Sequence, residues 1–251
     1  MVETNNICKT FSETKGKETR AVVDVDFKAK PGQIHALLGV NGAGKTTLLR
    51  MLSTVIRPTS GSATVNGFDV VKSSADARSS IGFMSTTTAL YGRLTPREML
   101  AYFGGLYGMQ GARLSSRIEE VLQLLDASSF ADKLCDRLST GQKQRVSIAR
   151  TILHDPPILF FDEPTAGLDI LASQTVLEQI ERARSSGKVV IFSTHIMSEV
   201  ERLADQITII HEGRIRASGT TESLRELSGL QSLEQVFLHF IGGSVDGVSH
   251  P

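Results

Sequence analysis

The feature that most constrains the fold is a glycine-rich segment that lies between an apolar run and a helix-like run: Gly39-Val40-Asn41-Gly42-Ala43-Gly44-Lys45-Thr46. It matches the pattern G-x-x-x-x-G-K-[ST] at every fixed position. Glycines let the backbone curl so that successive N–H groups point inward, and a following helix adds its positive N-terminal end. A glycine-rich turn with a solvated lysine is the alternative. The flanking pattern favours a strand, a phosphate-binding loop and a helix.

Short apolar runs followed by turn residues and helical periodicity are typical of a largely parallel sheet covered by helices. The helix after the glycine-rich segment is predicted over Lys45–Val55, with one apolar stripe of Leu48, Leu49, Leu52 and Val55. The predicted buried strands are Ile34–Leu38, Ile158–Phe161, Val189–Ser193 and Ile207–Ile210.

The stretch from about residue 95 to 151 contains no convincing strand, and its apolar residues follow helical spacing, which predicts an inserted helical subdomain. Its first helix is expected to begin at Thr95, because Pro96 suits the first helical position and Glu98 can complete a capping box. Residues 221–243 are predicted to form one or two short helices. Residues 244–251 are expected to be a flexible tail.

Two adjacent carboxylates, Asp162 and Glu163, follow the apolar run Ile158–Phe161. A buried strand that ends in an aspartate suits a Mg²⁺ site beside a phosphate loop, and the glutamate is then placed to polarise an attacking water. Taken alone, the pair is equally compatible with a solvated strand end. The phosphate loop upstream favours the metal and catalytic interpretation.

Composition narrows the class of protein further. The chain has 27 Lys plus Arg and 27 Asp plus Glu, so no summed positive field attracts nucleic acid over a long range. Cys8 and Cys135 match no metal-ligand spacing and suit free thiols. The N-terminus lacks the apolar core of a signal peptide, and the apolar runs fall far short of the roughly 20 residues that span a bilayer. We therefore expect a cytoplasmic protein.

Between the two sites lies the segment Leu138-Ser139-Thr140-Gly141-Gln142-Lys143-Gln144-Arg145. Ser139 and Gln142 have capping-box spacing, which predicts a helix from there to about Thr151 that presents free amides at its start. The segment resembles the signature motif of ABC-transporter ATPases, usually written L-S-G-G-Q. The phosphate loop, the signature, the carboxylate pair, the loop Ala166–Asp169 and a late histidine follow one another in that family's order.

The resemblance implies the fold and the domain organisation. The fold would be α/β, a P-loop NTPase core with a mostly parallel sheet, the inserted helical subdomain and a short antiparallel N-terminal β subdomain. Residues 1–243 would form one ATP-binding domain.

The resemblance also implies the site, with ATP and Mg²⁺ as cofactors. Lys45, Glu163 and the switch histidine His195 would be catalytic, and Thr46, Asp162 and Thr86 would bind Mg²⁺. Taken alone, a histidine after a strand is more often structural. The opposing copy would be contacted through Ser139, Gly141, Gln142 and Asp169. Nucleotide would be held by Phe11, which is also compatible with a core or surface role, and by Gly39, Asn41, Gly42, Ala43, Gly44, Lys45, Thr46 and Thr47.

The sequence departs from the family pattern at two places. No glutamine occurs between Gln33 and Gln110, where most relatives carry one that senses Mg²⁺ and the attacking water. Thr86, or Ser85, would take its place and reach Mg²⁺ through water. Thr140 replaces the first of the two glycines of the signature, and we expect this change to be tolerated because Gly141 keeps the closest approach.

The expected function is that of an ATP-binding and ATP-hydrolysing subunit that energises export through a separate transmembrane permease. Its ATPase partner would be an identical or a paralogous subunit. Short segments, 85–98 and 232–237, resemble the Nat-type sodium exporters of the ABC-2 group. The permease is expected to contact Leu90, Tyr91, Met99, Tyr102 and Phe103, which are equally compatible with subdomain core.

The alternative function is a non-transport ABC ATPase that acts on nucleic acid or the ribosome. Such proteins usually carry two cassettes, long coiled coils or basic linkers, and this chain shows none of these features. We therefore expect no nucleic-acid partner.

Overall fold

The computed structural model describes residues 1–12, 18–85 and 90–242. Thr86, predicted as a Mg²⁺-site residue, lies outside these ranges. The central sheet has the strand order β11-β10-β4-β9-β8-β7, and all neighbours are parallel except β10 and β11. The predicted mostly parallel sheet is thus confirmed. Its strands are β4 (Gln33–Leu38), β7 (Ile81–Met84), β8 (Ile158–Asp162), β9 (Val189–Thr194), β10 (Gln206–His211) and β11 (Arg214–Gly219).

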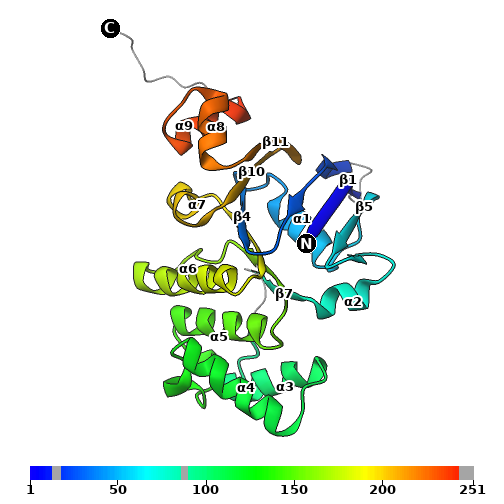
Figure 1. Ribbon diagram of the computed structural model, residues 1–251. Helices are drawn as coiled ribbons and strands as arrows, with labels where there is room; N and C mark the ends of the chain where they lie inside the picture. Colours follow the sequence, from blue (N-terminus) through cyan, green and yellow to red (C-terminus); the bar gives the residue numbers. More distant parts are fainter. Residues whose placement is uncertain (13–17, 86–89, 243–251) are drawn as a thin grey trace.

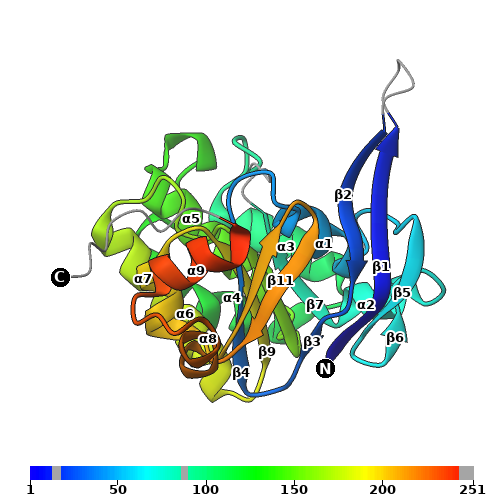
Figure 2. The same cartoon turned by 90° about the horizontal axis from the view of Figure 1, so that it is seen from above.

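A second, antiparallel sheet is formed by the N-terminal third of the chain and follows the order β2-β1-β5-β6, with β3 paired to β1. It lies at one side of the molecule, opposite the C-terminal helices (Figure 2). Its strands are β1 (Val2–Ser12), β2 (Glu18–Val25), β3 (Lys28–Ala29), β5 (Ser60–Val65) and β6 (Phe68–Asp69).

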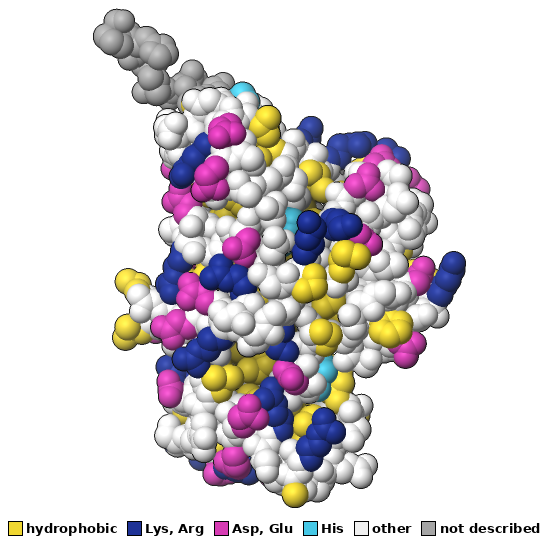
Figure 3. Space-filling model, in the orientation of Figure 1, with side chains coloured by type: hydrophobic (Ala, Val, Ile, Leu, Met, Phe, Trp, Pro, Cys, Tyr) yellow, Lys and Arg dark blue, Asp and Glu magenta, His cyan; other side chains and the backbone are white. Residues whose placement is uncertain are grey.

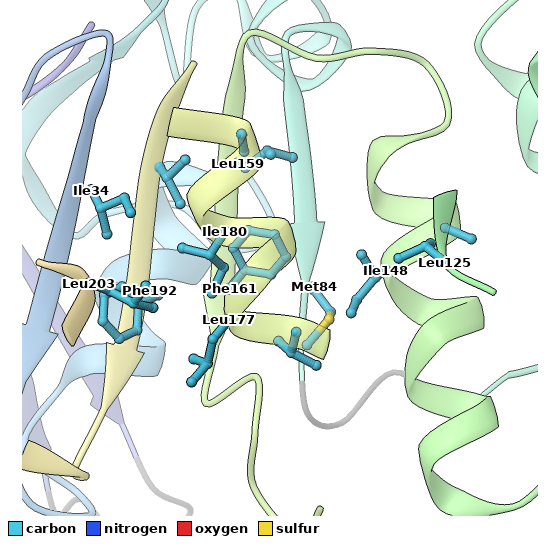
Figure 4. Packing of buried hydrophobic residues seen from close by; sticks show 14 of the residues in the cluster. Ile34, Met84, Leu125, Ile148, Leu159, Phe161, Leu177, Ile180, Phe192 and Leu203 are labelled. Atoms are coloured by element: carbon cyan, nitrogen blue, oxygen red, sulfur yellow. The ribbon is translucent and has the colours of Figure 1, made fainter. Parts of the chain in front are cut away.

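The central sheet is buried on both faces, because its strands alternate between two apolar clusters. In β8, Leu159 and Phe161 belong to the cluster formed with the helices that follow β7 in the chain. Ile158 and Phe160 belong to the cluster that contains α1 (Lys45–Leu52) and the antiparallel sheet. Phe161 lies beside Leu177 and Ile180, whereas Phe192 lies beside Leu203 (Figure 4). This double burial explains why the strands read as continuous apolar runs.

Helix α1 is shorter than the sequence predicts. It ends at Leu52, and Thr54 adopts a positive φ of 62° that turns the chain away. Val55 is therefore not part of the buried stripe and is 61% exposed. A short helix α2 (Ser74–Ser79) precedes β7.

Three helices follow β7 and pack together at the end of the molecule opposite α8 and α9 (Figure 1). Both predicted capping boxes are present, at Thr95 with Glu98 and at Ser139 with Gln142. Met99 is 0% exposed and belongs to the core, so its predicted place on a contact surface is wrong. The elements are α3 (Pro96–Leu106), α4 (Gly111–Leu124), 3₁₀ turns over Ser128–Phe130 and Cys135–Arg137, and α5 (Thr140–Ile152).

The remaining helices are α6 (Ile170–Ser185), α7 (Met197–Leu203), α8 (Thr221–Ser228) and α9 (Leu233–Ile241). No helix formed by the described ranges combines the length and apolar character that a membrane crossing requires. On the face shown in Figure 3, acidic and basic side chains are interspersed, so neither sign of charge dominates it.

Candidate functional site

The glycine-rich segment joins β4 to α1, as the sequence predicts, and close packing demands its glycines. A Cβ atom at Gly39 would lie 2.4 Å from the carbonyl oxygen of Ile210. Gly44 has φ 108°, and a Cβ atom there would lie 2.5 Å from the carbonyl oxygen of Ala21. The loop is therefore held against β10 and β2. A pocket of about 140 Å³ opens at it, lined by Ala21, Asn41, Gly42, Ala43, Gly44, Lys45, Thr46, Thr47 and Glu163.

Lys45 begins α1 and is only 4% exposed. Its ammonium group donates hydrogen bonds to the carbonyl oxygens of Gly39 at 2.7 Å and Val40 at 3.2 Å. It also forms an ion pair with Glu163, with 3.3 Å between Nζ and Oε1. The loop thus satisfies the charge of its lysine with oxygen atoms.

Asp162 ends β8 and is fully buried. Its Oδ1 accepts hydrogen bonds from the hydroxyls of Thr46 at 2.9 Å and Ser193 at 2.7 Å. Its Oδ2 is buried and has no hydrogen-bond partner among the described residues. A buried carboxylate oxygen without a partner is costly, and a divalent cation shared with the Thr46 hydroxyl would satisfy it. These residues fit Mg²⁺.

Glu163 sits directly above the strand ends in a strained conformation, since a φ of 47° is unusual for a residue with a side chain. Its amide donates to the carbonyl oxygen of Ser193 at 3.1 Å and to the Ser193 hydroxyl at 3.0 Å. Its Oε1 lies 3.5 Å from Nδ1 of His195, whose side chain is 48% exposed. The carboxylate therefore lies between Lys45 and His195, facing the phosphate loop.

Ser193 bonds to both carboxylate residues and is not among the site residues predicted from the sequence. The signal was available, because a serine at the carboxyl end of a buried apolar strand, next to a predicted site, has to bond to something nearby.

A second hydrogen-bond cluster, also not predicted, lies directly behind the site. Glu199 of α7 is 6% exposed, and its Oε1 accepts a hydrogen bond from the hydroxyl of Thr165. Its Oε2 accepts from the hydroxyl of Thr194 at 2.7 Å. Thr194 also accepts from the amide of Ile196 at 3.0 Å. On sequence alone Glu199 looks like an ordinary surface residue of an amphipathic helix.

The signature residues and Asp169 do not line the pocket at the phosphate loop. Ser139 is exposed and caps α5. Asp169 caps α6, its Oδ1 accepting from the amide of Ala172 at 2.8 Å. A Cβ atom at Gly141 would lie 3.3 Å from that of Ala172, so the two helix starts are close neighbours. Together they form a separate exposed surface.

Phe11 is also absent from the residues that line the pocket. It lies on β1 opposite Thr19, its ring is 41% exposed, and the ammonium group of Lys9 lies 5.0 Å from the ring centroid. The ring is accessible from solvent at the end of the antiparallel sheet.

Comparison with known proteins supplies the context for this geometry. A family model described as ABC transporter matches residues 22–166. The chain is 39% identical to the ABC transporter ATP-binding protein NatA of Bacillus subtilis (strain 168), over 92% of this chain and 94% of that protein. It is 35% identical to the linearmycin resistance ATP-binding protein LnrL of the same strain, over 94% of this chain and 74% of that protein.

Solved structures agree. A structure described as an ATP binding subunit of an ABC transporter matches with a TM-score of 0.85 and 29% identity, over 96% of this chain and 99% of that one. A dimeric structure of a post-hydrolysis state of the ATP-binding cassette MJ0796, bound to ADP and Pi, matches with a TM-score of 0.80 and 26% identity, over 88% of this chain and 98% of that one. The predicted P-loop NTPase fold is therefore confirmed.

Proposed function

The chain belongs to the ABC transporter family of ATP-binding proteins, and we propose that it hydrolyses ATP to energise export through a separate integral-membrane permease. Exporter-type relatives such as the linearmycin resistance protein support the direction of transport. No comparison favours the alternative of an ATPase that acts on nucleic acid or the ribosome.

One observation carries the proposal. Residues from three separate parts of the sequence converge at the carboxyl ends of β4, β8 and β9, within hydrogen-bond or ion-pair distance of one another. They supply a cation, a metal-type carboxylate and a general base around one phosphate loop, which is the set of groups that phosphoryl transfer to water requires. These residues are Lys45, Thr46, Asp162, Glu163 and His195.

Each residue has a proposed role that follows from its position. The loop amides and Lys45 bind the phosphates and offset negative charge that develops on the γ-phosphoryl group. Glu163 polarises the attacking water, and His195 orients Glu163 and contacts the γ-phosphate. Asp162 and Thr46 would hold Mg²⁺, which when bound neutralises charge on the phosphate oxygens.

The exposed surface formed by Ser139, Gly141, Gln142 and Asp169 is proposed to face the nucleotide of a second ATPase subunit, identical or paralogous. The free amides at the start of α5 can bind an anion there. The dimeric state of the cassette MJ0796 supports this arrangement. Phe11 is proposed to stack on adenine, since its ring is exposed.

Thr86 is proposed to replace the glutamine of most relatives, sensing Mg²⁺ through a water molecule. Thr86→Ala should then change the rate of ATP hydrolysis by the purified protein, and an unchanged rate would reject the role.

The permease is proposed to dock on the cytoplasmic side in a groove of about 360 Å³ between β7, α3 and α5. Arg150 faces this groove, its guanidinium carbon 5.2 Å from the Phe103 ring centroid. It forms no salt bridge with a described carboxylate, and burial lowers its pKa from the ordinary value. The exposed Tyr91 also lines it, and the exposed Tyr102 packs edge-on against Tyr91, with 6.3 Å between the ring centroids. An acidic side chain on a permease helix with apolar neighbours would complement this surface.

The proposal is tested by purifying the chain with and without a candidate permease subunit expressed together with it. We expect the pair to co-purify with membranes and the permease to stimulate ATP hydrolysis. Arg150→Glu should abolish the stimulation and leave the basal rate intact, whereas Arg113→Glu, an exposed control on α4, should change neither. Stimulation by ribosomes or DNA instead would overturn the transporter assignment.

Arg93 is exposed and suits charge reversal as a second docking probe, but Arg97 does not, because it is paired with Glu119 and Asp132. The cargo depends on the permease. The resemblance of residues 85–98 and 232–237 to Nat-type sodium exporters makes the sodium ion the first cargo to assay.

A further inference from the structure

Glu199 is a buried acid outside the set of residues that the proposed reaction uses. It lies on α7 with 6% exposure, and no described cation forms an ion pair with it. Burying a carboxylate is strongly unfavourable unless hydrogen bonds satisfy it. Both of its oxygens are satisfied by hydroxyl groups, from Thr165 on one side and Thr194 on the other.

The two hydroxyls come from the two segments that carry reacting groups. Thr165 lies between Glu163 and Asp169, in a loop closed by backbone bonds from Ala166 to Glu163 and from Leu168 to Thr165. Thr194 is the last residue of β9 and immediately precedes His195. Glu199 therefore joins the loop after β8 to the end of β9, behind the Glu163–His195 contact.

The signature helix is bonded to the same loop. The side-chain amide of Gln144 on α5 donates to the carbonyl oxygen of Pro164, the residue between Glu163 and Thr165. A continuous series of bonds thus runs from the helix that would face the second subunit, through the loop after β8, to Glu199 and the strand end before His195.

We infer that Glu199 is a positioning residue for ATP hydrolysis, one that fixes the spacing between Glu163 and His195. The inference rests on the proposed function. A carboxylate is the side chain of this size that accepts from both hydroxyls at once, because an amide of the same shape presents only one acceptor oxygen. The geometry of a general base and its neighbour is sensitive to small displacements, and misplacement by about 1 Å can cost up to 100-fold in rate.

The test uses the isosteric variant Glu199→Gln and the variants Thr165→Val and Thr194→Val. Each valine variant is compared with the serine variant at the same position, Thr165→Ser or Thr194→Ser. We expect the glutamine and valine variants to lower kcat roughly tenfold with the KM for ATP changed less than about twofold. The serine variants keep the hydroxyl and should keep kcat. If Glu199 had only a structural role, kcat would not fall while KM stays constant, and kcat would not differ between the valine and serine variants.

A matched control exists in the same sheet. His35 and Thr208 are both buried, with 2.8 Å between His35 Nε2 and Thr208 Oγ1, and the Thr208 hydroxyl lies 2.9 Å from that of the exposed Ser218. Thr208→Val should lower the melting temperature and leave kcat unchanged. Equal loss of kcat in Thr208→Val and Glu199→Gln, or an unaltered kcat in Glu199→Gln, would overturn the inference.

The wild type and Glu163→Gln are measured alongside. If the wild type hydrolyses no more ATP than Glu163→Gln, the proposed function fails and this inference fails with it. If the wild type is active and Glu199→Gln equals it, only the inference fails.

Discussion

The phosphate-loop surface and the signature-helix surface differ in how complete they are within one chain. At the first, Lys45 and Asp162 are buried, and Thr46 with Asp162 and Lys45 with Glu163 join distant parts of the sequence. At the second, Ser139 is exposed, and within the described residues its hydrogen bonds stay in its own helix start. Ile170 and Leu171, which follow Asp169, are 79% and 77% exposed.

This difference separates residues that folding of one chain brings together from residues that would need a second subunit. Apolar side chains this exposed are costly to leave in water and typical of contact surfaces when they are adjacent. The fold of one chain brings the residues of the phosphate-loop surface together, whereas the signature-helix surface is proposed to become a binding site only when it meets a second subunit.

The largest expected effect comes from a substitution at the phosphate-loop surface. Glu163→Gln should lower kcat by at least about 100-fold, because the general base is lost while the phosphate contacts remain. Phosphate release measures kcat, and equilibrium binding of a fluorescent ATP analogue should show that affinity is retained. Glu212→Gln, an exposed residue paired with Arg216, is the control and should behave as wild type. A loss of less than tenfold would remove Glu163 from the base role.

The next largest effect is expected from substitutions at the signature-helix surface. Ile170→Asp and Leu171→Asp should each weaken ATP-dependent dimerisation by about 2 kcal/mol, roughly thirtyfold, since each removes apolar area that the dimer would bury. Sedimentation velocity with ATP in a Glu163→Gln background reports the dimer. Leu227, 71% exposed on α8, provides the control Leu227→Asp. Equal dimerisation in all three variants would place the second copy elsewhere.

A smaller effect separates capping from function. Ser139→Ala and Thr95→Ala each remove the side chain of a complete capping box and should each lower the free energy of unfolding by about 1 kcal/mol. Only Ser139→Ala should also lower ATP hydrolysis, several-fold, because only that helix start would face nucleotide. Urea unfolding and phosphate release are measured on both. Similar ATP hydrolysis in the two variants would make Ser139 a cap and nothing more.

The smallest expected effect on activity is none, because the last prediction concerns stability alone. It concerns the buried His35 of β4. Burial lowers the pKa of His35 to about 4, below its ordinary value of 6.5. The unfolded chain therefore binds more protons between these values, so the stabilisation is complete above about pH 6.5 and is lost as the pH falls toward 4. The loss is on the order of 3 kcal/mol. Urea unfolding at several pH values measures it.

His154 contributes in the same direction, since burial also lowers its pKa to about 4. His35→Gln should flatten the pH dependence of unfolding, while the ATPase activity at pH 7 stays that of the wild type. An unchanged pH dependence would exclude His35 as its source.

Local features of the molecule could be predicted from the sequence. The phosphate loop and the boxes at Thr95 and Ser139 depend on residues within a few positions of each other, so their spacing is visible in the chain. The end of α1 was mispredicted, because Val55 continues the apolar periodicity although the backbone turns at Thr54.

Contacts between distant segments could not be predicted. Glu199 meets Thr165 only because β8 and β9 are neighbours in the sheet, and no pattern around Glu199 in the sequence signals that pairing. Ser193 is similar, since its bond to Asp162 depends on the same register.

The ammonium group of Lys45 has three oxygen partners, the carbonyls of Gly39 and Val40 and the carboxylate of Glu163. A phosphate bound by Lys45, as proposed, would compete with these oxygens for the same ammonium group. In the proposed reaction, Glu163 would then be free to polarise water only once phosphate pairs with Lys45. Activation of the proposed base would in this way depend on nucleotide binding.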